Sequence, residues 1–167
     1  MSTKQKFEIT INLSDISKDI ILNKEYVPNN LKENIRASDI LFIPNIIEDK
    51  PLYEVETLDL FNYFKSQESE GLKSEICVAD DEFQYRREEA VPEFIALGWF
   101  LVKYVVIKPF LRKLKEYIIR KFKKDTPIEL KLSIKHSERT KVVEIKYKGL
   151  PDHIDTIFSR LEEFWNE

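Results

Sequence analysis

The sequence predicts an α+β fold: an N-terminal strand, a βαβ-like unit, a long kinked apolar helix, a β-hairpin and a C-terminal amphipathic helix. Three patterns predict it. Residues 7–13 alternate apolar and polar side chains, which is the period of a half-buried strand. Residues 128–134 and 143–147 alternate in the same way on either side of a polar turn, as in a hairpin. Residues 154–165 repeat apolar side chains at helical spacing.

The segment between the first strand and residue 80 predicts smaller elements. Ile16, Ile20 and Ile21 indicate a short helix that "YVPNN" ends, and "ILFI" at 40–43 predicts a buried strand that stops at Pro44. Residues 48–57 are typical of a loop, from which Thr57 can cap a helix.

The helix after Thr57 carries either Leu58, Phe61 and Phe64 or Leu60 and Phe64 on its buried side, and "SEICVA" then predicts a second buried strand. A strand, a helix and a strand in this order favour a right-handed parallel βαβ unit.

The stretch "FIALGWFLVKYVVI", residues 94–107, is the most apolar part of the chain. A spanning helix needs about 20 apolar residues, and Lys103 interrupts this shorter run. We therefore predict a helix in the core, with Pro92 in its first turn, Trp99 inside and a kink near Lys108 caused by Pro109. A helix that contacts a membrane or a partner, and a true span, stay as alternatives.

Both halves of the chain are too short to build a substantial core alone. We predict one composite domain over residues 1–167, with a loose internal division near Ala90.

Composition excludes several classes of protein. The formal charge of -3 argues against nucleic-acid binding by the whole chain, so no specific nucleic-acid partner is predicted. Cys77 is the only cysteine, which predicts a reduced, cytoplasmic setting, and the N-terminal residues lack the pattern of a secretory signal. Three glycines, too far apart, exclude a phosphate-binding loop, and two histidines with one cysteine cannot build an ordinary zinc site. No cofactor is predicted.

The segment 110–124 combines an apolar helical stripe with seven basic side chains and one acidic one, Glu116. This pattern fits a solvated helix face, or a surface for an acidic protein, a nucleic acid or an anionic lipid. The candidate partner-binding residues are Arg112, Lys113, Lys115, Arg120, Lys121, Lys123 and Lys124. Replacing the last four together is expected to leave folding nearly intact.

Acidic residues supply the alternative chemistry. Asp80, Asp81 and Glu82 follow the second strand of the βαβ unit, and clustered carboxylates suit Mg²⁺, which would serve a hydrolase or nuclease. Two further acid-x-lysine pieces, at 129–131 and 144–146, match part of a nuclease strand. Their outward register favours plain cross-strand pairing of glutamate with lysine.

From Ala90 to Phe164 the order is apolar helix, basic helix end, "IELKLSIK" paired with "VVEIKYKG", and a short helix. This order resembles the effector-associated constant component proteins of bacterial conflict systems. The resemblance implies a non-enzymatic accessory protein that accompanies a variable effector.

The sequence therefore predicts a bacterial, cytoplasmic interaction or accessory module, not an enzyme, with an unidentified protein partner. The alternatives are the Mg²⁺-dependent enzyme and a peripheral membrane protein that uses its basic helix.

Overall fold

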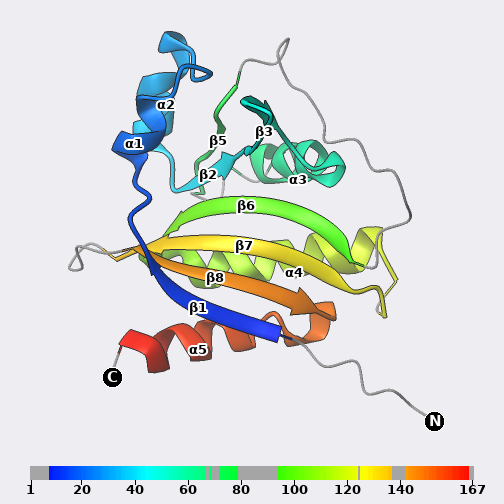
Figure 1. Cartoon of the computed structure of the whole chain (residues 1–167). Helices are drawn as coiled ribbons and strands as arrows, with labels where there is room; N and C mark the ends of the chain where they lie inside the picture. Colours follow the sequence, from blue (N-terminus) through cyan, green and yellow to red (C-terminus); the bar gives the residue numbers. More distant parts are fainter. Residues whose placement is uncertain are drawn as a thin grey trace.

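The computed structural model describes residues 8–66, 68, 72–78, 94–123, 125–136 and 142–165. Its centre is a six-stranded sheet (Figure 1). The strand order is β1 (Glu8–Ser14), β8 (Val142–Gly149), β7 (Ile128–Lys135), β6 (Ile95–Lys103), β2 (Ile40–Ile43) and β5 (Ser74–Ile76). A separate hairpin pairs β3 (Asn45–Ile47) with β4 (Lys50–Leu52).

Five α-helices lie around the sheet in the described part of the chain. They are α1 (Lys18–Leu22), α2 (Lys32–Ala37), α3 (Val55–Ser66), α4 (Ile107–Lys121) and α5 (Thr156–Trp165). Single turns of 3₁₀ helix, Asn29–Leu31, Tyr104–Val106 and Pro151–His153, introduce α2, α4 and α5. None of these helices is long and apolar enough to cross a bilayer.

The two faces of the sheet are covered differently. Helices α3, α4 and α5 pack on one face and build the larger apolar core, whose members come from both sides of residue 90. Helices α1 and α2 cover the other face only over β2, β5 and the end of β6. Figure 1 shows the result: β7, β8 and β1 have helices behind them and none in front.

Several sequence-based predictions are confirmed. Strand β1, helix α1, the β7–β8 hairpin and helix α5 lie where the patterns predict them. The unit formed by β2, α3 and β5 is also present, because β2 and β5 pair in parallel. The alternating residues of the hairpin, from Ile128 to Ile134 and from Val143 to Tyr147, point into the core and are fully or nearly fully buried.

The predicted long kinked helix is wrong. Residues 95–103 form strand β6, and only the segment from Ile107 is α-helical. Phe100 and Val102 face the larger core, while Leu101 faces the smaller one, so β6 is apolar on both sides. A strand buried on both faces shows no alternation, which is why the pattern resembles a buried helix. Trp99 is only partly buried.

Three smaller predictions in this region are corrected as well. Pro109 is the third residue of α4, where no intrahelical donor is required, so it fits the first turn and α4 runs unbroken to Lys121. The predicted loop at 48–57 contains β4 and the start of α3. Thr57 lies inside α3, and its hydroxyl donates to the carbonyl of Leu97. The position of Pro92 lies outside the described residues.

Candidate functional site

Helix α4 forms because apolar residues recur every three or four positions along a basic sequence. Phe110, Leu111, Leu114, Tyr117 and Ile118 are buried in the larger core. The apolar stripe of α4 is therefore buried in the core, and the side of α4 that faces solvent is mainly polar.

Three of the predicted basic residues are neutralised by the fold itself. Lys113 is largely buried and lies 3.8 Å from Glu116, and Lys115 pairs with Asp155 at 2.9 Å. Lys121 contacts carboxylates of α3, with both Glu56 and Asp59 at 2.6 Å. Partial burial opposes the charge of Lys121, but hydrogen bonds to Asp59 and Glu56 raise its pKa above the ordinary value. These lysines hold helices together more than they offer charge to a partner.

The other described basic residues form an exposed stripe. Arg112, Arg120 and Lys123 are exposed and make no ion pair with a described residue. Ile119 lies among them with half of its surface exposed, and a shallow depression runs beside it between Arg112 and Arg120. We call Arg112, Ile119, Arg120 and Lys123 the α4 ridge. Lys124 lies outside the described residues.

We expect substitutions at the neighbouring basic residues Arg120 and Lys121 to change the free energy of unfolding by different amounts. Lys121→Met keeps the aliphatic stem but breaks two contacts with α3, so the free energy of unfolding should fall by about 1 kcal/mol. Arg120→Gln should change it by less than about 0.5 kcal/mol. Urea denaturation of both variants checks this difference, and equal effects would contradict it. The expectation that all four late basic residues can be replaced without loss is therefore corrected for Lys121.

The magnesium alternative gains no structural support. Asp80, Asp81 and Glu82 lie outside the described residues, and the described residues hold no group of three metal-ligating side chains. The glutamates of both acid-x-lysine pieces pair with lysines across the strands as predicted, whereas Lys146 makes no ion pair with a described residue. Lys131 contacts Glu144 at 2.8 Å, and Lys148 contacts Glu129 at 3.7 Å.

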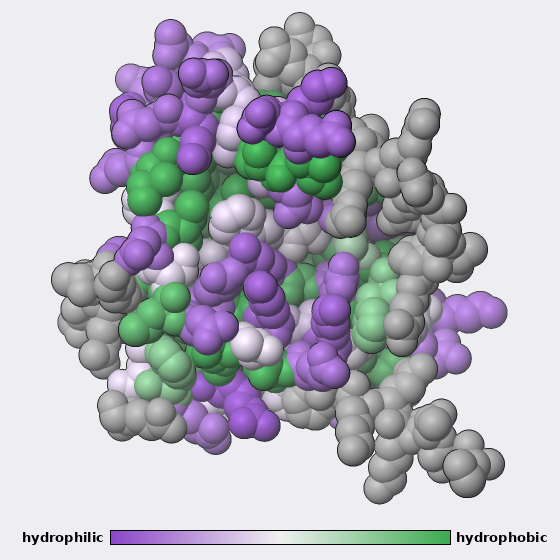
Figure 2. Space-filling view, viewed as in Figure 1, coloured by the Kyte–Doolittle hydropathy of each residue, from purple (hydrophilic) through white to green (hydrophobic). Residues whose placement is uncertain are grey.

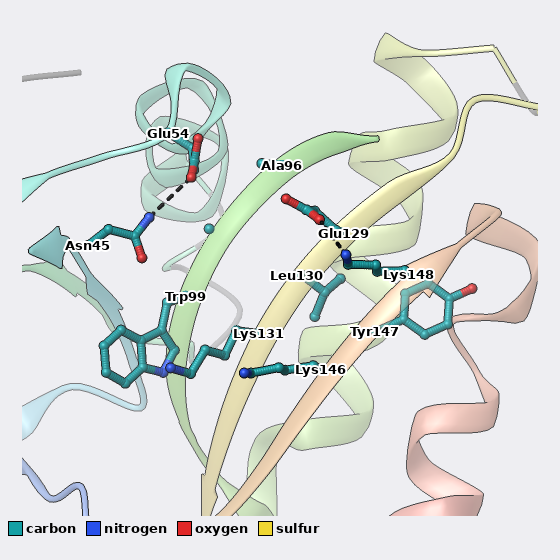
Figure 3. A pocket seen from close by; sticks show the side chains of 11 residues that line it. Asn45, Glu54, Ala96, Trp99, Glu129, Leu130, Lys131, Lys146, Tyr147 and Lys148 are labelled. Carbon is teal, nitrogen blue, oxygen red and sulfur yellow. Dashed lines mark hydrogen bonds and ion pairs between the residues drawn. The ribbon is translucent and has the colours of Figure 1, made fainter. Parts of the chain in front are cut away.

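A cavity of about 220 Å³ opens on the uncovered face of the sheet, over β6, β7 and β8 (Figure 3). One side carries lysines from the hairpin: Lys131, Lys146 and Lys148. Asn45 and Glu54 form the opposite wall, where the Asn45 amide donates to the Glu54 carboxylate at 3.1 Å. Figure 2 shows hydrophilic side chains gathered over β7 and β8 on this face. The sequence indicated the outward lysines but not the wall from the β3–β4 region.

Lys18 is a further residue that sequence reasoning missed. Its ammonium donates to the carbonyls of Arg36 and Ser38 at the end of α2, where helix carbonyls lack internal partners. Burial lowers the pKa of Lys18 from 10.5 to about 8; the nearby charge of Lys103 also lowers it, and Asp39 raises it. The signal in the sequence is only a lysine near a short helix.

We expect Lys18 to make stability depend on pH. Its folded pKa lies below its unfolded pKa, so between pH 8 and 10.5 the unfolded chain binds more protons and stability rises with pH. Below about pH 8 the folded state carries the full cost of the buried charge. In Lys18→Met, urea denaturation at pH 7.5 and 9.5 should show a smaller rise than in the wild type. An equal rise in both proteins would contradict the assignment.

Comparison with protein-family models, with curated proteins and with solved structures finds no match for this chain. The resemblance of residues 90–164 to effector-associated constant component proteins stays a prediction. The element order behind it changes in one respect, because β6 replaces the expected apolar helix ahead of α4.

Proposed function

We propose that this protein is a non-catalytic, cytoplasmic accessory module that docks an acidic segment of a partner protein on the α4 ridge. The proposal agrees with the accessory role that the resemblance implies.

One observation carries the proposal: the α4 ridge combines exposed positive charge with an exposed apolar side chain on one helix face. Arg112 and Ile119 are seven residues apart, which places them on one side of the helix, and Lys123 follows the end of α4 at Lys121. Because Glu56 and Asp59 of α3 neutralise Lys121, and Asp155 just before α5 neutralises Lys115, the charge of the ridge remains available. A mixed basic and apolar stripe suits an acidic amphipathic segment.

The membrane alternative is weaker on this geometry. An interfacial helix buries its apolar face in the lipid boundary, but the apolar face of α4 contacts β7, β8 and α3 within the core. Insertion would have to open that core. The half-exposed side chain of Ile119 would by itself contribute little apolar contact with a lipid surface.

Salt dependence tests the proposal. A partner held by the α4 ridge should co-purify with the tagged chain at 0.1 M salt, where the Debye length is about 10 Å, and should be lost near 0.5 M. The recovered protein should carry an acidic segment. A salt-resistant partner would contradict docking through these charges, and substrate turnover by the purified chain would contradict a non-catalytic role.

A further inference from the structure

The uncovered face of the sheet carries a second site that the accessory role does not use. From the geometry of the 220 Å³ cavity we infer that it binds a nucleoside phosphate, with the base between Trp99 and Glu54 and the phosphate on Lys146 and Lys148 (Figure 3). The α4 ridge lies on the opposite side of the sheet, so the two sites are independent.

The floor of the cavity is open because β6 is irregular there. The pairing of β6 with β7 shifts register between Ala96 and Trp99, and Gly98 has a φ of 122°. The methyl group of Ala96 is small, and the side-chain position at Gly98 is directed at the Thr57 hydroxyl of α3, so residue 98 presents only backbone to the cavity. A flat ring can therefore approach the backbone of β6 closely.

The lysine side of the cavity has more positive charge than its carboxylates neutralise. Lys131 and Lys146 are directly opposite each other on β7 and β8, an arrangement in which like charges repel. Glu144 contacts Lys131 and Glu129 contacts Lys148, but Lys146 makes no ion pair with any residue that the structure describes. A phosphate beside Lys146 would supply the missing negative charge and would share Lys148 with Glu129.

The remaining walls suit a nucleobase. The Trp99 indole is held by its Nε1–H, which donates to the Ser133 hydroxyl at 2.9 Å, and Lys131 lies 3.8 Å from the ring centroid. A base can take the place of Lys131 on the indole while Lys131 turns to the phosphate, since bases stack well on aromatic side chains. The Glu54 carboxylate, only 6% exposed and already accepting from the Asn45 amide, lines the wall where an exocyclic amine of the base would lie. This arrangement needs no glycine-rich loop, because side chains supply the phosphate contacts.

Fluorescence titration tests the site. In a Trp165→Phe background Trp99 is the only tryptophan, so its quenching by adenosine monophosphate reports binding directly. We expect saturable quenching, with adenosine alone and inorganic phosphate alone each binding at least about tenfold more weakly. Lys146→Ala should weaken the monophosphate at least about tenfold and leave adenosine unchanged. Lys24→Ala, an exposed lysine on another surface, is the matched control.

No quenching at 10 mM monophosphate, on the order of the weakest binding expected of a built site, would overturn the inference. Equal binding by the Lys146→Ala variant and the wild type would also overturn it, provided both melt at the same temperature. A five-residue oligoadenylate distinguishes the source of the ligand. Tighter binding than the monophosphate identifies single-stranded RNA, and weaker binding identifies a free nucleotide; both results support the site.

Discussion

Replacing Gly98 by alanine is expected to lower the free energy of unfolding by about 2–4 kcal/mol. Gly98 has a φ of 122°, a backbone conformation that residues with a Cβ rarely adopt. A Cβ at this position would also lie 2.8 Å from the hydroxyl oxygen of Thr57. That hydroxyl donates to the Leu97 carbonyl, so the new methyl group would disturb the bond that ties α3 to β6.

The sign of this change distinguishes strand β6 from a helix at the same residues. In a helix, glycine to alanine stabilises by about 1 kcal/mol, so an unchanged or higher stability in urea denaturation would contradict the strand. The double variant Thr57→Ala with Gly98→Ala is the control. It removes the clash and leaves the backbone strain, so it shows how much of the loss each cause contributes.

Reversing the charge of the α4 ridge is expected to abolish partner binding. In Arg112→Glu with Arg120→Glu and Lys123→Glu, three attractive contacts with an acidic segment become repulsive, which should weaken binding at least about 100-fold. Folding should be nearly unaffected, because none of the three makes an ion pair with a described residue. Binding measured by biolayer interferometry with the partner recovered by co-purification checks this.

The matched control reverses three exposed basic residues elsewhere, Lys24, Arg36 and Lys50. It changes the net charge of the protein by the same amount. If the control loses as much affinity as the ridge variant, overall charge and not the ridge governs binding, and the docking surface is wrong.

Alternation in the sequence predicts the elements that have one face on the core and one face without a helix, whereas β2, buried on both faces, is predicted as a strand by its short length before Pro44. Strands β7 and β8 alternate apolar and polar side chains over most of their length because α4 and α5 cover one face and no helix covers the other. Strand β6 lacks that contrast, since α1 and α2 cover Leu101 from the second side. Whether a short apolar run is covered once or twice depends on elements far along the chain, so the pattern alone leaves helix and strand equivalent.

The candidate sites show the same limit. The basic face of α4 is visible in the sequence as charge at helical spacing. Which of its charges are neutralised depends on Glu56, Asp59 and Asp155, each about 40 residues or more away along the chain. The cavity on the sheet likewise joins Glu54 to lysines on β7 and β8, and no local spacing predicts that meeting.

Site-specific photocrosslinking in the source cells tests the docking surface most directly. A photoreactive phenylalanine derivative replaces Ile119 on the α4 ridge or, as the control, Val105, which is 77% exposed before α4 begins. If the α4 ridge docks the partner, position 119 should yield a crosslinked protein with an acidic segment and position 105 should yield none. Crosslinking from position 105 alone, or only to lipid from position 119, would contradict it.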